Sequence, residues 1–382
     1  MRLALVLDRF DPGRGGLEHW AWQWTTWLLD RGHEVDVVAA EAAAGTIRPG
    51  LRLHPLGEPA GRDGSRYAFA ERVAGYLPQV DADVVHDLGV GWRCDILQPQ
   101  FGTRLADDRR AMASLPPGRR FAARLSWQRR KRLADIRRLE GRQYAAGGPH
   151  VVAVSRMTSA DLRSIHGIPA GRIEVIHNGV DLSRFTPACD AERSAARQRF
   201  GMDGFVLVFV GHNFRLKGLD TVLRAVSRLR RSDVRLLVVG RGPIESYRRK
   251  AGRLGIAERV TFTGGLSDAR VAYAAADAFV QPTFYDPCSL TVLEAAASGL
   301  PVLTTRFNGA SEFFAHGRSA WILDDSADDR AAADAITTWF DPRVRLDMAE
   351  AGRAASETAT HERCFTRLLA ACHRVVERRR AA

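Results

Sequence analysis

Two acidic residues, Asp286 and Glu294, stand eight positions apart in the segment FYDPCSLTVLEAAASGLPVLTT. The residues between them predict a helix start, and the glycine that follows is typical of a helix end. The free N–H groups at such a start favour an anion such as phosphate, and here they belong to Ser289, Leu290 and Thr291. Glu294, about two turns into the helix, is placed to accept hydrogen bonds from ribose hydroxyls.

A second interpretation stays open for Asp286. Aspartate followed by proline at the first helical position is an ordinary helix cap, so its carboxylate would serve the backbone instead of a ligand. Glu294 has apolar neighbours on both sides in the run TVLEAAA. A carboxylate among residues expected to be buried favours a binding role.

A pair of cations follows another apolar run, in the segment FVGHNFRLKGLD. Arg215 and Lys217 come just after a predicted strand that ends at Gly211. The edge where parallel strands end is the usual place for ligands in such sheets. Arginine binds phosphate groups in a fork and lysine acts as a point charge, so we expect both to hold a diphosphate. The alternative is a solvated loop with two surface cations.

Three features carry a weaker signal. Gly15 and Gly16 lie between the first predicted strand and a long helix, where the backbone can approach an anion, although a plain turn is the alternative. The pair is not a G-x-G-x-x-G fingerprint, so no dinucleotide cofactor is expected. His86 follows DVV at a strand end and is either a cleft residue or part of a turn. The Asn-Gly pairs at 178 and 308 predict turns.

Short apolar runs that predict strands alternate with helix-like runs along the whole chain, which indicates parallel sheets with helices on both faces. The stretch 186–204 is polar, rich in small residues and without a strand pattern, so we place a hinge there. The expected domains are 1–185, with a basic segment at 104–142, then 205–365, and a C-terminal basic helix at 366–382.

The length of 382 residues favours two lobes. Hydrophobic residues make up 46% and charged residues 26%, the balance of a soluble globular protein. No apolar run approaches the roughly 20 residues that span a bilayer. The run Leu3 to Leu7 is too short for a signal-peptide core and predicts a buried strand. Five scattered cysteines without a C-x-x-C spacing indicate a reduced, cytoplasmic protein without structural zinc.

The net charge of +12 is concentrated in the segment 104–142, which holds thirteen Arg or Lys against four acids. Such a block implies an anionic partner, and nucleic acid is the weakest candidate because no nucleic-acid-binding motif accompanies it. The stretch ARLSWQRRKRLADIRRL combines leucine, isoleucine and tryptophan with arginine, as an interfacial helix does. We expect peripheral binding to anionic lipid; the alternative is a solvated basic helix that packs locally.

Several motifs occur together in one order: GGLE at 15–18, IHNGVD at 176–181, the Arg215 and Lys217 loop, VVGRGP, VTFTG, the two spaced acids and NGASE. In this order they resemble the retaining glycosyltransferases of family four, and the resemblance covers essentially the whole chain. It implies the GT-B fold, an α/β architecture of two doubly wound Rossmann-like lobes facing a central cleft. Within the family the chain is most similar to bacterial lipopolysaccharide-core glucosyltransferases.

The resemblance implies a nucleotide-sugar donor, expected to be a UDP-sugar, and a glycan or lipid-linked acceptor such as lipopolysaccharide core. Arg215 and Lys217 would bind the diphosphate, Glu294 the ribose and Asp286 the transferred sugar, which makes Asp286, Arg215 and Lys217 the catalytic set. The other expected donor contacts are Gly16, Thr263, Gly264, Ser289, Leu290 and Thr291. The implied reaction is front-side transfer with retention, in which the leaving diphosphate helps to deprotonate the acceptor, without a metal or cofactor.

Two residues depart from the family pattern. Asp286 stands where the family usually has glutamate, so its contact with the sugar is one methylene shorter. Gln100 stands where many relatives have histidine, and glutamine cannot exchange a proton at neutral pH. We expect His86 and Gln100 on the acceptor side, and a location at the inner face of the plasma membrane.

Two other functions are compatible with the same residues. A non-hydrolysing nucleotide-sugar epimerase shares the two-lobed architecture and would release epimerised nucleotide-sugar without an acceptor. A non-catalytic nucleotide-sugar-binding protein would bind the donor without turnover.

Overall fold

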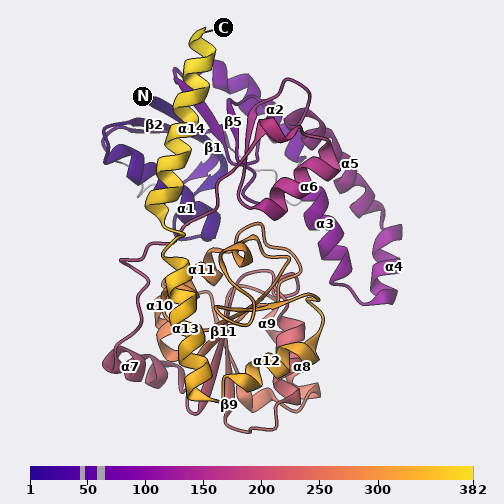
Figure 1. Cartoon of the computed structure of the whole chain (residues 1–382). Coiled ribbons are helices and arrows are strands. Elements are labelled where there is room, and N and C mark those ends of the chain that lie inside the picture. Colours follow the sequence, from indigo (N-terminus) through magenta and orange to yellow (C-terminus); the bar gives the residue numbers. More distant parts are fainter. Residues whose placement is uncertain (44–47, 58–64, 382) are drawn as a thin grey trace. The chain divides into compact units, whose positions relative to one another are not determined.

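The computed structural model describes residues 1–43, 48–57 and 65–381. These residues form two compact units (Figure 1). The first comprises Met1–Arg109, Pro116–Ile176 and Glu362–Ala382, and the second comprises His177–His361 together with Arg110–Leu115. Each unit has its own parallel sheet and its own core, as the alternating pattern of the sequence predicts.

The first unit is built on a seven-stranded sheet with the order β3-β2-β1-β4-β5-β6-β7. Every neighbouring pair in it is parallel. The strands are β1 (Arg2–Phe10), β2 (Glu34–Ala42), β3 (Leu51–Pro55), β4 (Val84–Asp87), β5 (Ile96–Leu97), β6 (His150–Ala153) and β7 (Ile173–Val175). The apolar stretch Leu3–Leu7 is fully buried in β1, so the expected first strand is confirmed.

The other elements of this unit are mainly helices. They are α1 (Gly16–Leu29), α2 (Arg66–Tyr76), α3 (Arg104–Ala113), α4 (Pro117–Leu125), α5 (Trp127–Gln143), α6 (Arg156–His166) and α14 (His361–Ala381), with 3-10 turns η2 (Leu77–Gln79) and η3 (Ala170–Arg172). Trp20 and Trp24 of α1 are fully buried and pack on Phe365 of α14, with ring centroids 5.7 and 5.2 Å apart. The tryptophans at helical spacing therefore belong to the core, the more common role of such a stripe.

The second unit is built on a six-stranded sheet with the order β10-β9-β8-β11-β12-β13. Its strands are β8 (Phe205–Val210), β9 (Val234–Val239), β10 (Val260–Gly264), β11 (Ala278–Val280), β12 (Val302–Thr305) and β13 (Trp321–Leu323). Its helices are α7 (Asp190–Phe200), α8 (Leu219–Arg228), α9 (Ile244–Arg253), α10 (Arg270–Ala275), α11 (Leu290–Ala297), α12 (Asp329–Thr338) and α13 (Pro342–Ser356), with η4 (Ala257–Arg259) and η5 (Gly309–Phe313). β8 pairs with β11 although β9 and β10 come between them in the sequence. The strand order therefore runs outward from β8 in one direction to β10 and in the other direction from β11 to β13.

The stretch expected to be a hinge, 186–204, lies inside the second unit and contains α7. Arg193 and Arg197 of this helix both bind Asp277, at 2.5 and 2.6 Å. The polar composition reflects a surface helix held by ion pairs, and the change between units falls near residue 176 instead of 185.

The C-terminal helix also differs from its expected bounds. It begins at His361 instead of residue 366, and its residues from Glu362 onward group with the first unit. Arg367 and Arg374 of α14 bind Glu174 at the end of the first sheet, at 3.5 and 2.6 Å. The basic character of this helix therefore serves, in part, to attach it to the sheet.

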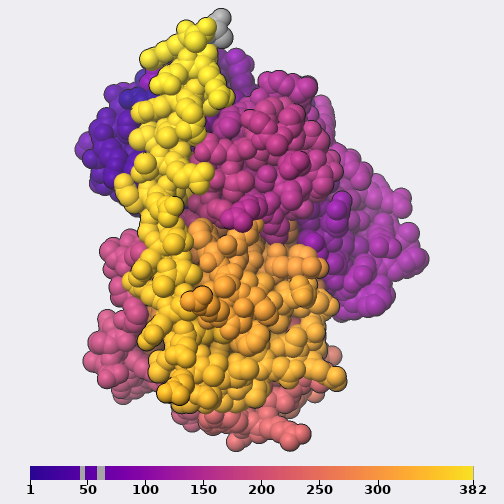
Figure 2. Space-filling view, viewed as in Figure 1, coloured from indigo at the N-terminus to yellow at the C-terminus, as the bar shows by residue number. Residues whose placement is uncertain are grey.

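The basic segment 104–142 forms three helices instead of one interfacial helix. α4 ends at Leu125, and the Ser126 hydroxyl accepts the N–H of Arg129 to start α5. Ile136 and Leu139 are buried and belong to the core of the first unit, where α5 packs against α2. Figure 1 shows α4 standing away from the seven-stranded sheet, and the purple atoms of this region project from the first unit in Figure 2.

Among the described residues, no helix combines the length and apolar character needed to cross a membrane.

Candidate functional site

The loop after β8 carries the two expected cations into a tight turn before α8. Gly218 has φ +84°, and a Cβ there would collide with the carbonyl oxygen of Pro282. Lys217 N–H donates to the Asn213 carbonyl at 3.1 Å, and Leu219 N–H donates to the Phe214 carbonyl at 2.9 Å. Because Gly218 lets two backbones approach closely, the loop is fixed at the carboxyl end of β8, the edge where such sheets bind ligands.

Lys217 and Asp286 form an ion pair between Nζ and Oδ2. The Asp286 carboxylate is largely buried, and its backbone is held by Phe307 O at 2.9 Å and Gly309 N at 2.8 Å. α11 begins only at Leu290, so Asp286 is not its cap and the alternative interpretation of this residue is wrong. The side chain is instead directed at the cation of the β8 loop.

A buried polar network ties the start of α11 to the end of β8. Gln281, fully buried, donates from Nε2 to the Val210 carbonyl at 2.7 Å and accepts the Ser289 hydroxyl on Oε1 at 3.2 Å. The Ser289 N–H is donated to Asn308 Oδ1 at 3.2 Å. Of the three backbone amides expected to face phosphate, that of Ser289 is thus used within the protein, and those of Leu290 and Thr291 begin the helix.

Glu294 lies about one turn into α11, nearer the helix start than the sequence predicts, and its carboxylate accepts a hydrogen bond. The Tyr273 hydroxyl donates to its Oε2 at 2.9 Å. Burial raises the pKa of Glu294 to about 7, while the Tyr273 hydrogen bond and Arg184 oppose that rise. The carboxyl group therefore changes charge near neutral pH, which is unusual for glutamate.

The ends of β8, β9 and β10 lie close together beside this site. Gly240 N–H donates to the Gly264 carbonyl at 2.8 Å, and a Cβ on Gly240 would collide with the Gly211 carbonyl oxygen. The Thr263 hydroxyl donates to the Gly264 carbonyl at 2.9 Å. Arg241 is the residue after Gly240, and its backbone N–H donates to His212 Nδ1 at 3.0 Å. Burial, Arg241 and Lys217 lower the pKa of His212, so the ring stays neutral.

Arg215 and Lys217 act on different neighbours: Lys217 pairs with Asp286, and Arg215 acts electrostatically on Tyr247 of α9. The charge of Arg215 opposes the upward shift of the Tyr247 pKa, which burial and Asp220 cause. The Tyr247 ring meets Phe214 edge-on at 5.4 Å, and its hydroxyl donates to Asp220 at 2.9 Å. Tyr247 of α9 therefore supports the β8 loop by contacting Phe214 in the loop and Asp220 at the start of α8.

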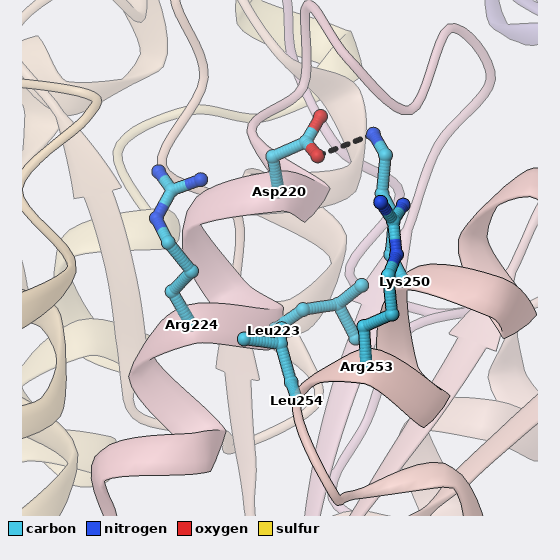
Figure 3. A pocket seen from close by; sticks show the side chains of 6 residues that line it. All are labelled: Asp220, Leu223, Arg224, Lys250, Arg253 and Leu254. Atoms are coloured by element: carbon cyan, nitrogen blue, oxygen red, sulfur yellow. Dashed lines mark hydrogen bonds and ion pairs between the residues drawn. The ribbon is translucent and has the colours of Figure 1, made fainter.

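A cavity of about 270 Å³ lies between α8 and α9 beside this support. Figure 3 shows Asp220 facing Lys250, with which it forms an ion pair at 2.5 Å, above Leu223 and Leu254. Arg224 and Arg253 flank the cavity. The Asp220 carboxylate in this cavity already accepts hydrogen bonds from Lys250 and Tyr247. The cavity is therefore part of the scaffold behind the β8 loop.

The expected residues of the first unit occupy different environments. Gly16 is the first residue of α1, and Gly15 before it is extended, so the glycine pair does form a strand-to-helix turn. His86 has no exposed surface: its Nε2 bonds Gln98 Oε1 at 3.0 Å, and burial lowers its pKa to about 4. As a neutral core residue it does not reach an open acceptor site. Gln100 is partly exposed, shortly after β5.

Three residues of the second unit's site were not predicted from the sequence. Tyr273 and Gln281 bind the expected site residues directly, and Asn308, predicted only as a turn residue, orients the start of α11. Gln281 did leave a signal, because it interrupts the apolar run AFVQP at a strand end. Tyr273 lies in a helix of ordinary composition and left none.

Together these residues form a cradle suited to a phosphorylated ligand. Lys217 supplies a cation beside the start of α11, whose dipole favours negative charge. Glu294 offers a carboxyl oxygen for hydroxyl groups one turn further on. Among the described residues no group of three or more His, Cys, Asp or Glu side chains is placed to hold a metal ion.

Comparisons with known proteins agree with this arrangement. The family model described as Glycosyltransferase Family 4 matches residues 14–184, and the model described as Glycosyl transferases group 1 matches residues 204–341. The chain is 31% identical, over 92% of its own length and 92% of the relative's, to a GDP-mannose-dependent alpha-(1-6)-phosphatidylinositol monomannoside mannosyltransferase of Mycolicibacterium smegmatis. It is 32% identical, over 61% of its length and 57% of the relative's, to a D-inositol 3-phosphate glycosyltransferase of Pseudarthrobacter chlorophenolicus.

Solved structures share the fold over nearly the whole chain. WaaG, a glycosyltransferase involved in lipopolysaccharide biosynthesis, matches with a TM-score of 0.78 at 21% identity, over 93% of this chain and 95% of WaaG. Anabaena HepE in complex with UDP-glucose matches with a TM-score of 0.73 at 18% identity, over all of both chains. The two parallel Rossmann-like sheets are those of the GT-B fold. The chain therefore belongs to the group 1, family 4 glycosyltransferases, and it is a retaining hexosyltransferase of a metal-independent family.

Proposed function

We propose that this protein transfers mannose from GDP-mannose, with retention, to a lipid-linked polyol or glycan acceptor. The observation that carries the proposal is the 31% identity, over 92% of both chains, to a mannosyltransferase named for that donor and for a phosphatidylinositol mannoside acceptor. A UDP-sugar donor and a lipopolysaccharide-core acceptor, expected from the sequence, have support from solved structures of 21% and 18% identity. They remain the other outcome of the experiment below.

Each site residue has a role in this proposal. Lys217 and the amides at the start of α11 bind the diphosphate, and Arg215 adds a second cation from the same loop. Glu294 accepts hydrogen bonds from the ribose through the oxygen that Tyr273 leaves open. Asp286, steadied by Lys217, lies beside the phosphate position and contacts the transferred sugar. Backbone groups of Thr263 and Gly264 border the base.

In the proposed sugar transfer, negative charge develops on the leaving diphosphate. The bond between the sugar C1 and the β-phosphate oxygen breaks, and the acceptor oxygen forms a bond to C1 on the same face. The acceptor's proton passes to the departing phosphate oxygen. Lys217 and the dipole of α11 stabilise the negative charge that grows on the diphosphate, which is the main catalytic contribution a protein makes to such a departure.

We also propose that the α4–α5 region holds the first unit on an anionic membrane surface. Phe121, Leu125 and Trp127 are exposed by 65%, 59% and 71%, a high exposure for large apolar side chains. Arginines surround them in the sequence. Apolar side chains beside dense positive charge favour the boundary between headgroups and acyl chains.

A donor screen tests the enzymatic proposal. The protein is incubated with GDP-mannose or UDP-glucose and vesicles that contain phosphatidylinositol or its mannosides, and the released nucleoside diphosphate is measured. We expect GDP release that depends on the lipid acceptor. Acceptor-dependent UDP release, with none from GDP-mannose, would replace the proposed donor. Nucleotide-sugar epimerisation without acceptor would replace the reaction itself.

A further inference from the structure

Arg241 lies in the motif VVGRGP, and its side chain has no role in the site described above. It is the second residue after the end of β9 and is exposed. Its N–H is fixed on His212, and the close approach of Gly240 to Gly211 anchors its backbone. Within the described residues no carboxylate is paired with its guanidinium, although exposed arginines elsewhere on this chain commonly form ion pairs.

The side chain of Arg241 leans across the end of the neighbouring strand. Gly265 follows β10, and a Cβ there would lie 3.0 Å from Arg241 Nε and 3.1 Å from its Cγ. Glycine at 265 thus leaves the room in which the arginine lies. Arg241 is thereby held along the loop after β10 with its fork of donors exposed.

This loop is next to the carboxylate that would bind ribose. The loop leads into α10, and the hydroxyl of Tyr273 in that helix donates to Glu294 Oε2 at 2.9 Å. A nucleotide whose diphosphate lies at Lys217 and whose ribose lies at Glu294 extends its base towards this loop. Nucleotide ligands of open parallel sheets lie along the same carboxyl edge.

We propose that Arg241 is the residue that selects guanine over uracil in the donor. Guanine presents two adjacent acceptors, O6 and N7, which match the two parallel donors of a guanidinium. Adenine places a donor beside N7, and uracil has no such pair of acceptors. The inference rests on the proposed function in that it assumes a nucleoside diphosphate in this site.

Nucleotide binding without sugar transfer tests this role. Dissociation constants for GDP, UDP and ADP are measured by calorimetry for the parent, Arg241→Ala, Arg241→Lys and the control Arg318→Ala, an exposed arginine of the same unit. We expect the parent to prefer GDP over UDP by about 10-fold or more, as one forked contact to a base allows. Both Arg241 variants lose that preference, lysine included because it lacks the fork, and the control keeps it.

Two results would overturn the assignment: a parent that binds UDP as tightly as GDP, or an Arg241→Ala variant whose ratio of GDP to UDP affinity is unchanged, whether both affinities stay the same or both fall equally. An equal fall of both affinities would mean that Arg241 acts on the phosphates. Thermal unfolding of each variant shows that it is folded. A GDP preference that depends on Arg241, without any sugar transfer, would leave this inference standing and contradict the proposed function. Transfer from GDP-mannose by an Arg241→Ala variant that keeps the parent's GDP preference would do the reverse.

Discussion

At the scale of single residues, the ion pair of Lys217 with Asp286 is the centre of the proposed donor site. Lys217→Met keeps the length of the side chain and removes its charge. We expect nucleoside diphosphate binding to weaken roughly 10- to 100-fold, the range of a hydrogen bond to a charged group. Lys131→Met, at an exposed position of α5, is the matched control. Parent-like affinity of the Lys217 variant in calorimetry would contradict the assignment.

The raised pKa of Glu294 predicts that donor binding depends on pH. This pKa of about 7 means that the carboxylate needed for ribose hydroxyls forms as pH rises through 7, so affinity should increase between pH 6 and 8. Glu294→Gln should abolish this dependence. Tyr273→Phe removes a hydrogen bond that lowers the pKa, so the midpoint should move to higher pH. A midpoint unmoved in Tyr273→Phe would show that the tyrosine does not act on the carboxyl group.

The same raised pKa has a consequence for stability. The folded chain keeps the proton on Glu294 up to about pH 7, whereas the unfolded chain releases it near the ordinary value of 4.5. The contribution of this group to the free energy of unfolding is therefore fully present below pH 4.5 and is lost as pH rises to 7. Relative to the parent, Glu294→Gln should gain thermal stability over this interval, and an unchanged difference across it would contradict the shift.

Spacing along the chain predicted which residues form the proposed nucleotide site but not how they are held. Lys217, Asp286 and Glu294 follow from strand ends and a helix start, which are local patterns. Their partners are remote: 69 positions separate Lys217 from Asp286, and 21 separate Tyr273 from Glu294. His86 shows the converse, because a strand end alone does not reveal that the side chain points into the core.

At the scale of elements, the turn from β8 into α8 depends on Gly218. Gly218→Ala should destabilise the protein by more than about 1 kcal/mol, the cost of a left-handed conformation alone, because the new Cβ also collides with Pro282. Gly255→Ala is the matched control, with φ +71° and open space around its Cβ. Urea unfolding compares the two, and equal losses would mean that close packing at Gly218 is unimportant.

The α4–α5 region predicts binding to anionic vesicles. Arg129 pairs with Asp108 within the fold, so exposed charges are the better test. Neutralising Arg124, Arg130 and Lys131 together, or replacing Trp127 by serine, should reduce co-sedimentation with phosphatidylinositol vesicles several-fold. Replacing Arg248, Arg249 and Arg253 of α9 is the charge-matched control. Equal binding by all these variants would exclude this region as the contact.

The alternation of apolar and helix-like runs predicted both sheets, but it did not predict where the two units and the helices of the basic segment begin and end. Each expected strand run forms a strand because buried parallel strands are nearly continuous apolar stretches. The stretch 186–204 was expected to be a hinge because α7 is polar, but this helix packs on α10 and pairs with Asp277, so it belongs to the second unit. The break at Ser126 has a short capping signal that a basic composition obscures.

At the scale of the whole molecule, the proposed donor site and the proposed membrane-binding region lie in different units. The second unit carries the residues suited to a nucleoside diphosphate, and the first carries the basic, apolar-tipped α4–α5 region. This division matches the family, in which one chain joins a nucleotide-sugar to a second substrate. The central claim is therefore a transfer between two substrates with retained configuration.

The most direct measurement of that claim is the configuration of the product. Proton NMR of the glycolipid formed from GDP-mannose and a phosphatidylinositol-type acceptor reports the anomeric configuration of the new bond. We predict an α-linked mannose, as in the donor, formed in equal amount with released GDP. A β-linked product, or consumption of the donor without any glycolipid, would contradict the account.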